Sequence, residues 1–376
     1  MKFNIWEDCP KTPITELLSF IVDNRGKTVP TVADGWKLIA TNCVTNNTLF
    51  PVYEKVRYLT QETYETWFRA HPIPGDILFV NKGTPGRVCM VPDPVDFCIA
   101  QDMIALRADD EKIYNKYLFA VLRSREIQQQ IYNTNVGDVI PHFKKQFMDQ
   151  LLIPVPSRKI QEAIGNLYYE LSYKTELNKK INENLAAQAQ AIYQKYFLIA
   201  ADPNWALGHL SDLINVKYGK DHKKLADGVY PVYGSGGIMR YVERPLYEKE
   251  SVLIPRKGTL NNVMYVNQPF WSVDTMFYTE MKQANVAKFV YHFVKSKDLA
   301  SMNAGSAVPS MTTAILNALE LRIPSAEALR QFESSVAPMY EMMKKNEVQS
   351  RKLAELRDVL LPKLMSGETD VSELDL

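Results

Sequence analysis

Two long segments of the chain repeat apolar residues every three or four positions, which predicts two long amphipathic helices. The first begins after Pro156, with Ser157 as the expected N-cap, and continues to about Leu198 without a proline. The second begins after Pro324, with Ser325 in the same role. The apolar positions are Ile160, Ile164, Leu167, Leu171, Leu177, Ile181, Leu185, Ile192 and Tyr196 in the first helix, and Leu329, Phe332, Val336, Met339, Met343, Leu353, Leu356, Leu360 and Leu364 in the second. Stripes this narrow bury little surface on a lone helix, so we expect the two helices to pack on each other as a coiled-coil-like pair.

Polar residues interrupt both apolar stripes. They are Lys174, Asn178 and Gln188 in the first helix, and Asn346 and Ser350 in the second. A polar residue at an otherwise apolar position of a helix pair fixes the register of the pair. We expect these residues to have that role.

The segments 1–156 and 201–324 have a different pattern. Short runs of β-branched and aromatic residues are separated there by Gly, Pro and Asn. This pattern is typical of short strands joined by turns. The sequence therefore predicts two α+β domains, each followed by one long helix.

The two halves of the chain are copies of each other. Five segments recur in the same order: 14–18 with 210–214, 26–27 with 219–220, 78–84 with 253–259, Asp102 with Asp274, and 137–156 with 305–324. The offset between the copies shrinks steadily from 196 to 168 residues, as expected if the second copy has shorter surface loops. The duplication predicts the same architecture in both halves.

Composition excludes several classes of protein. The 376 residues are 46% hydrophobic and 23% charged, which is ordinary for a globular protein of two or three domains. No apolar run approaches the length of a membrane span, and the first residues lack the apolar core of a secretory signal. The four cysteines have no metal-binding spacing, so we interpret them as free thiols in a reducing cytoplasm.

The net charge of +1 argues against a general polyanion binder, so any nucleic-acid role depends on local basic patches. Known catalytic motifs are also missing. Gly26-Lys27-Thr28 resembles the end of a phosphate-binding loop, but Ile21 stands where that loop requires glycine. The five histidines are scattered without metal spacing. We therefore expect no catalytic residue and no metal site in this chain.

The strongest binding candidates are two turns at corresponding places in the copies. One contains Lys82, Thr84 and Arg87, and its counterpart spans residues 256–262. Lys and Thr bind phosphate oxygens, while Arg and Asn form bidentate contacts with guanine or adenine edges. A tight hairpin with solvated ends would also explain either turn alone, but its retention in both copies favours a shared role.

A second candidate region is the basic run 220–224, followed by the glycine-rich run 230–237 with Tyr233 and Ser235. Clustered cations favour phosphate contacts, although a solvated loop would have the same composition. Arg25 and Lys27 occupy the corresponding place in the first copy. The segments 137–141 and 305–309 are interpreted as structural turns.

His142 and Ser310 follow these turns and complete the candidate set. The predicted DNA contacts are Arg25, Lys27, Lys82, Thr84, Arg87, His142, Lys220, His222, Lys223, Lys224, Tyr233, Ser235, Arg256, Lys257, Thr259, Asn261, Asn262 and Ser310.

This layout resembles the specificity subunit of type I restriction–modification enzymes. The resemblance covers essentially the whole chain and rests on the duplication, on YPVYGSGG at 230–237, on Lys-Gly-Thr in both halves, and on the strand–Pro endings IPVPS at 153–157 and RIPS at 322–325. It implies an α+β fold with two pseudo-repeated target-recognition domains, separated by two long antiparallel coiled-coil-like helices. The implied segments are 1–156 and 201–324 for the domains, 157–200 and 325–366 for the spacer helices, and 367–376 for a flexible acidic tail.

The resemblance also implies how such a chain works. Each domain would bind one half of a bipartite, asymmetric site in double-stranded DNA, and the helices would set the spacer and dock two methyltransferase subunits. S-adenosylmethionine, ATP and Mg²⁺ would belong to partner subunits, including a restriction motor-nuclease, so this chain would be non-catalytic and cytoplasmic. The alternatives are a related type II-like restriction–methylation system, a coiled-coil adaptor, or a stand-alone enzyme with an unrecognised active site.

Overall fold

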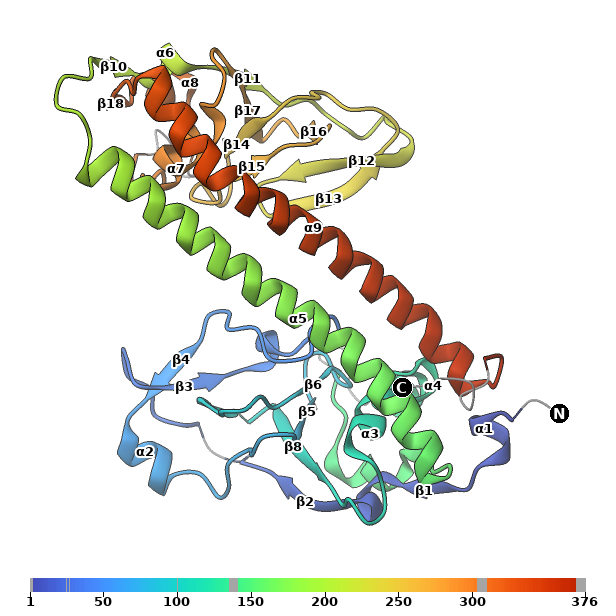
Figure 1. Cartoon of the computed structure of the whole chain (residues 1–376). Coiled ribbons are helices and arrows are strands. Elements are labelled where there is room, and N and C mark those ends of the chain that lie inside the picture. Colours follow the sequence, from blue (N-terminus) through green and yellow to red (C-terminus); the bar gives the residue numbers. More distant parts are fainter. Residues whose placement is uncertain are drawn as a thin grey trace. The chain divides into compact units, whose positions relative to one another are not determined.

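The computed structural model describes residues 3–24, 26, 28–99, 101–134, 141–302 and 310–369. The chain forms two compact units (Figure 1). Unit 1 comprises Met1–Ile181 and Lys345–Leu376, and unit 2 comprises Asn182–Lys344. The unit boundary therefore passes through the middle of both long helices. Each unit contains one α+β domain together with the adjoining half of each helix.

Unit 1 is built on two small sheets. The larger has the strand order β2 (Leu18–Val22), β8 (Met103–Ala108), β5 (Ile77–Val80) and β6 (Val88–Met90), and all its pairs are antiparallel. The smaller has the order β4 (Arg57–Leu59), β3 (Trp36–Ile39) and β7 (Phe97–Ile99), with β3 and β7 parallel. A two-stranded ribbon pairs β1 (Lys11–Pro13) with β9 (Leu152–Pro154). The helices are α1 (Ile5–Asp8), α2 (Gln61–Thr66), α3 (Asn115–Leu122) and α4 (Arg125–Asn133), with 3-10 turns at Ile14–Leu17, Thr41–Cys43 and Lys145–Gln150.

Unit 2 repeats this topology strand for strand. Its larger sheet has the order β11 (Ile214–Tyr218), β17 (Met276–Met281), β14 (Ser251–Pro255) and β15 (Met264–Val266). Its smaller sheet has the order β13 (Gly237–Val242), β12 (Asp227–Gly234) and β16 (Trp271–Ser272), again with one parallel pair. The ribbon pairs β10 (Leu207–His209) with β18 (Glu320–Arg322), and the short helices are α6 (Leu210–Leu213), α7 (Ala287–Lys295) and α8 (Thr313–Asn317). The predicted duplication is confirmed.

One predicted match between the copies is wrong by one residue. The backbone NH groups of Asn81 and Arg256 occupy the same position in the two units. Asn81 donates to the carbonyl of Asp102, and Arg256 donates to the carbonyl of Thr275 rather than of Asp274. Asp102 therefore corresponds to Thr275. The sequence match paired Asp102 with Asp274 because this aspartate directly precedes Thr275.

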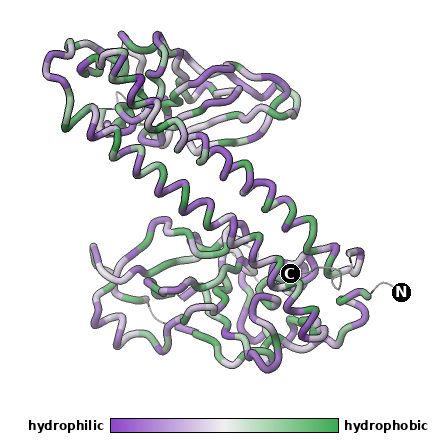
Figure 2. Tube along the Cα trace, in the orientation of Figure 1, coloured by the Kyte–Doolittle hydropathy of each residue, from purple (hydrophilic) through white to green (hydrophobic). Residues whose placement is uncertain are grey.

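The long helices are α5 (Arg158–Gln194), which ends in a π-helical turn at Lys195–Ile199, and α9 (Ala326–Met365). In each unit, the first part of one helix packs with the last part of the other, so the pair is antiparallel. Figure 2 shows the alternation of apolar and polar residues along both helices. The core of unit 1 contains Ile164 and Tyr168 of α5 with Leu361, Leu364 and Met365 of α9. The core of unit 2 contains Ala189 and Tyr193 of α5 with Leu329, Phe332, Val336 and Tyr340 of α9.

The prediction that polar interruptions join the two helices is confirmed for Asn178, Asn346 and Ser350. In unit 1, buried Asn178 donates through its Nδ2 to the carbonyl of Asn346 at 3.4 Å, to Gln349 Oε1 at 2.9 Å and to Ser350 Oγ at 3.2 Å. In unit 2, Asn182 Nδ2 donates to the carbonyl of Met343 at 3.0 Å. These directional contacts fix the register of the helices within each unit.

The same prediction is wrong for Lys174 and Gln188 of α5. Both side chains are exposed, and Gln188 donates to Asn184 of its own helix at 2.5 Å.

The segment after α9 was predicted to be a flexible acidic tail. Its first residues, 367–369, lie close to the N-terminal segment: Gly367 has φ +71°, and a Cβ built on it would lie 1.9 Å from the carbonyl oxygen of Phe3. Lys363 and Glu368 form an ion pair at 3.3 Å. Residues 370–376 lie outside the described residues.

Candidate nucleic-acid interface

The Lys-Gly-Thr turn of unit 1 (residues 82–87) joins β5 to β6. The backbone NH groups of Asn81 and Lys82 donate to the carbonyl of Asp102 at 2.9 and 3.3 Å. Lys82 also forms an isolated antiparallel bridge with His142, and Phe143 N donates to the carbonyl of Asn81 at 2.8 Å. These contacts bring Lys82 and His142 together although they are 60 residues apart in the chain.

The Lys-Gly-Thr turn of unit 2 (residues 257–262) has the same construction between β14 and β15. The NH groups of Arg256 and Lys257 donate to the carbonyl of Thr275 at 2.9 and 3.2 Å. Lys257 bridges Ser310, and Met311 N donates to the carbonyl of Arg256 at 2.9 Å. The two turns are therefore held by equivalent backbone contacts.

Glycine is required at the same place in both turns. Gly83 and Gly258 each have φ +85°, a left-handed conformation that costs other residues free energy. The adjacent side chains of Lys82 and Lys257 are both exposed. Two copies thus present a lysine on the same backbone geometry.

A pocket of about 350 Å³ adjoins the Lys-Gly-Thr turn of unit 1. It is lined by Asp23, Gly26, Arg69, Asn81, Lys82, Gln101, Asp102 and His142. Lys82 and His142 are among the predicted DNA contacts, whereas Arg69 and Gln101 belong to no motif and were not predicted. Arg25 and Lys27, predicted beside Gly26, lie outside the described residues.

The remaining candidates of the Lys-Gly-Thr turn of unit 1 differ in exposure. The Arg87 side chain is exposed, while Thr84 is half-buried and its carbonyl accepts from Arg87 N at 3.4 Å. Gln128 on α4 donates through Nε2 to the carbonyl of Gly86 at 2.8 Å. Arg87 therefore stands on a fixed backbone with its guanidinium in solvent.

The two asparagines of the Lys-Gly-Thr turn of unit 2 are engaged within the protein. Asn261 Nδ2 donates to Asp298 Oδ1 at 3.0 Å, and Asn261 Oδ1 accepts from Ala300 N at 3.0 Å. The hydrogen bond from Asn261 holds the pKa of the Asp298 carboxyl below its usual value. Asn262 Nδ2 donates to the carbonyl of Ser235 at 2.7 Å, and Thr259 is exposed.

The glycine-rich segment of unit 2 packs directly on this turn. A Cβ built on Gly258 would lie 2.8 Å from Ser235 Oγ. Tyr233 is half-buried on β12, and its hydroxyl accepts from Gln268 Nε2 at 3.4 Å. The structure therefore joins two motifs that the sequence separates by more than 20 residues.

The basic run 220–224 is anchored by its backbone. Lys220 N donates to the carbonyl of Ser272 at 2.8 Å, and the indole of Trp271 donates to the carbonyl of Lys220 at 2.8 Å. The side chains of Lys220, Lys223 and Lys224 are exposed. The Nδ1 atom of half-buried His222 is buried without a hydrogen-bond partner.

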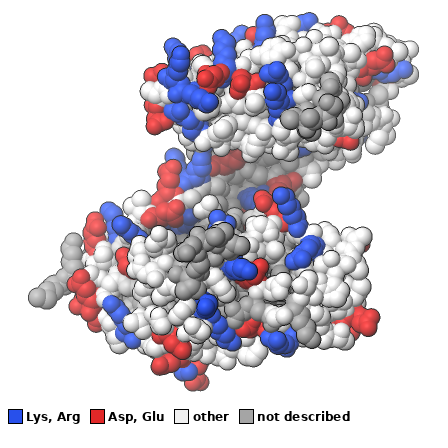
Figure 3. Space-filling view, turned by 180° about the vertical axis from the view of Figure 1, so that it is seen from behind, with Lys and Arg blue, Asp and Glu red and all other residues white. Residues whose placement is uncertain are grey.

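Arg256 completes the basic surface of unit 2. Its guanidinium lies over the exposed Tyr218 ring at 5.4 Å, and its Nη1 donates to the carbonyl of Asp274 at 3.2 Å. Figure 3 shows Lys and Arg interspersed with Asp and Glu over both units, with a denser basic group on unit 2. Basic groups are thus local, as the near-zero net charge predicts.

In the part of the chain that the structure describes, no three His, Cys, Asp or Glu side chains are grouped as metal ligands. None of its helices is long and apolar enough to cross a membrane. Two copies of one α+β unit with matching basic turns define a duplicated recognition protein.

Comparison with known proteins agrees with this class. A family model described as the type I restriction modification DNA specificity domain matches residues 29–187 and 203–334. The chain is 33% identical over 406 residues to the HindI specificity subunit of Haemophilus influenzae, covering 78% of this chain and 86% of that protein. It is 22% identical over 345 residues to the MjaIX specificity subunit of Methanocaldococcus jannaschii, covering 80% and 79%. The crystal structure of the S subunit from M. genitalium has the same fold, with a TM-score of 0.64, 19% identity and coverage of 96% and 98%.

The chain belongs to the type I restriction–modification DNA specificity family. It is a specificity subunit with two target-recognition domains, one in each unit.

Proposed function

We propose that each unit recognises one half of a bipartite, asymmetric DNA site. The observation that carries this proposal is the pair of Lys-Gly-Thr turns, which have equivalent backbone contacts but unlike side chains after the threonine. Equivalent backbones place the two turns alike against phosphates. The exposed Arg87 of unit 1 contacts a base that unit 2 cannot contact in the same way. The reason is that Leu260 is buried in unit 2, and Asn261 and Asn262 bind within the protein. The two half-sites therefore differ in sequence.

The helix pair sets the spacer between the half-sites and docks two methyltransferase subunits. Supporting this role, α5 and α9 each contribute to the cores of both units, and Asn178 and Asn182 fix their register. Half-sites contacted from one face of the duplex lie on the order of one helical turn, or a multiple of it, apart. Lengthening both helices would change the preferred spacer and leave the half-sites unaltered.

The chemistry resides on the partner subunits. Methyltransferase subunits would bind S-adenosylmethionine and methylate adenine, and a motor-nuclease subunit would use ATP and Mg²⁺. This chain would act in the cytoplasm as a non-catalytic recognition subunit. Membership of the specificity family supports this division of labour.

The experiment is to co-express this chain with its methyltransferase partner and to map methylated adenines genome-wide by single-molecule sequencing. A split motif of two unlike half-sites with a fixed spacer is expected. An uninterrupted motif would refute recognition by two separate domains. Failure of the complex to bind any duplex would favour an adaptor role.

A further inference from the structure

The hairpin of the smaller sheet is closed differently in the two units. In unit 2, Ser235 and Gly236 alone connect β12 to β13. In unit 1, residues 40–56 connect β3 to β4 and form a long connector loop. The stretch between the matched segments 26–27 and 78–84 is longer than the corresponding stretch of the second copy, between 219–220 and 253–259. Most of this extra length lies in the connector loop.

The connector of unit 2 contacts the Lys-Gly-Thr turn itself, and the connector of unit 1 contacts the residue directly after its turn. In unit 2, the carbonyl of Ser235 accepts from Asn262 Nδ2 at 2.7 Å. In unit 1, the side chain of Asn46 accepts from Val88 N at 2.8 Å. Val88 is the residue that directly follows Arg87. The connector loop therefore holds the end of the turn that carries the exposed arginine.

The connector loop also covers the free edge of β6, the outermost strand of the larger sheet. Met90 N donates to the carbonyl of Leu49 at 2.7 Å, and the carbonyl of Val88 accepts from Arg123 Nη2 at 2.8 Å. Edge-strand groups need such partners when they are covered. Val88 is thus held at both its NH and its carbonyl.

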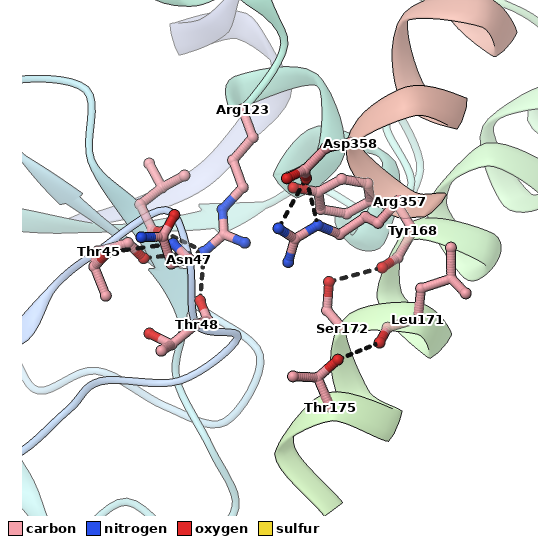
Figure 4. Close-up of polar contacts among 11 residues, drawn as sticks. Thr45, Asn47, Thr48, Arg123, Tyr168, Leu171, Ser172, Thr175, Arg357 and Asp358 are labelled. Carbon is pink, nitrogen blue, oxygen red and sulfur yellow. Dashed lines mark hydrogen bonds and ion pairs between the residues drawn. The ribbon is translucent and has the colours of Figure 1, made fainter. Parts of the chain in front are cut away.

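Arg123 joins this strand to the connector loop. Its Nη2 donates to the carbonyls of Thr45 at 3.2 Å and Thr48 at 2.5 Å as well as to Val88 (Figure 4). Its guanidinium lies over the Phe119 ring at 4.3 Å, so α3 fixes its direction. One side chain therefore fixes the loop and the strand together.

Glu176 joins the same loop to the long helix α5. Its Oε1 accepts from Leu49 N at 3.3 Å, and the side chain is buried. Contacts thus lead from α5 through Leu49 and the connector loop to Val88, next to Arg87. All these residues belong to unit 1.

We propose that Arg123 and Glu176 are positioning residues for DNA recognition by unit 1. They fix the Lys-Gly-Thr turn of unit 1 relative to α5, so that the Arg87 side chain meets a defined base. This inference rests on the proposed function of the turn. Neither residue contacts DNA in this arrangement.

The test uses the full chain in complex with its methyltransferase partner and the mapped DNA site. Binding is measured to duplexes that carry single base changes in either half-site. Arg123→Met is expected to reduce discrimination about tenfold in the half-site of unit 1 and to leave the other half-site within about twofold. Arg123→Lys, which keeps the charge but loses the planar fork, is expected to show a smaller reduction.

Arg357→Met is the matched control. Arg357 is also buried in unit 1, but it contacts the neighbouring Asp358 and the ring of Tyr168 rather than the connector loop (Figure 4). A general loss of packing would affect both variants alike. The proposal requires that Arg357→Met leave discrimination unchanged in both half-sites.

If Arg123→Met fails to fold, the same binding measurement is made on Asn46→Ala and Glu176→Gln. Full discrimination in these variants, or an equal loss in both half-sites, would overturn the positioning role. Arg87→Ala distinguishes a wrong positioning role from a wrong proposed function for the turn. If Arg87→Ala changes neither half-site, the turn does not recognise bases; if it relaxes one half-site and the positioning variants do not, only the further inference is wrong.

Discussion

The two units pack their long helices against equivalent short helices by opposite means. In unit 1, Gly165 of α5 lies so close to α3 that a Cβ would be 2.6 Å from Tyr117 N. The residue at the same place in α9 is Glu333, which forms an ion pair at 2.5 Å with Lys288 of α7. Lys288 is only 3% exposed and also pairs with Glu250 at 3.0 Å.

This difference shows which structural features the two copies share and which they do not. Strand order, turn backbone and helix placement are the same in both units, whereas the side chains that hold them differ. A close backbone approach and a buried ion pair are alternative ways to fix one helix crossing. The geometry that places each Lys-Gly-Thr turn is thus retained while the residues around it diverge.

The largest expected effect comes from breaking the ion pair of unit 2. Glu333→Ala leaves Lys288 buried with Glu250 alone and is expected to lower the free energy of unfolding of unit 2 by about 3–4 kcal/mol. Lys288→Met combined with Glu333→Leu is expected to cost far less, because no buried charge remains. Urea unfolding monitored by hydrogen exchange in α7 checks both. A loss below about 1 kcal/mol for Glu333→Ala would mean that the pair does not hold this crossing.

Unit 2 is also expected to lose stability in acid through a buried histidine. His292 Nδ1 donates to Gln190 Oε1 at 2.7 Å, and its Nε2 accepts from the Tyr340 hydroxyl at 2.9 Å. Burial lowers the pKa of His292 to about 4, so the unfolded chain binds the proton more readily between about pH 4 and 6.5. Neutral His292 therefore contributes fully to the unfolding free energy of unit 2 above pH 6.5. This contribution declines by about 3 kcal/mol as the pH falls toward 4.

His292→Gln is the control for this pH dependence. The difference in unfolding free energy between the wild type and this variant should narrow as the pH falls from 6.5 to 4. A constant difference would show that His292 does not titrate in this range.

The duplication was predictable because short segments recur in the same order in both halves. Both long helices were predictable because they depend on a local, periodic pattern. Apolar residues three or four apart define a helix face wherever they occur. The polar interruptions at Asn178 and Asn346 were also informative, since a buried amide in a helix stripe needs a partner on the other helix.

The contacts around the Lys-Gly-Thr turns were not predictable. Asn261 stands in the Lys-Gly-Thr turn of unit 2 and is a residue type that binds DNA bases, yet both ends of its amide bind residues 37 and 39 positions away. Arg69 and Gln101 line the pocket of unit 1 without belonging to any motif. Such placements arise from tertiary packing between distant segments, and no local pattern encodes them.

Gly165→Ala is expected to cost unit 1 about 2 kcal/mol. In an open helix the same change would add about 1 kcal/mol of stability, so a loss reports the backbone clash with Tyr117. Gly236→Ala is the control, because a Cβ at that position meets nothing within 4 Å. Urea unfolding measures the change in unfolding free energy for both variants. Equal changes for Gly165→Ala and Gly236→Ala would show that α3 can move away from α5 without cost.

The smallest expected effects compare the two exposed lysines. Lys82→Ala and Lys257→Ala should each weaken binding on all DNA sequences and lower the slope of log Kd against log salt by about one, since each removes one phosphate contact. Because the two turns share their backbone contacts, the losses should be equal and should add in the double variant. Titrations with duplex DNA at several salt concentrations measure the slopes. A loss confined to one base sequence would make that lysine a base contact and would end the equivalence of the two turns.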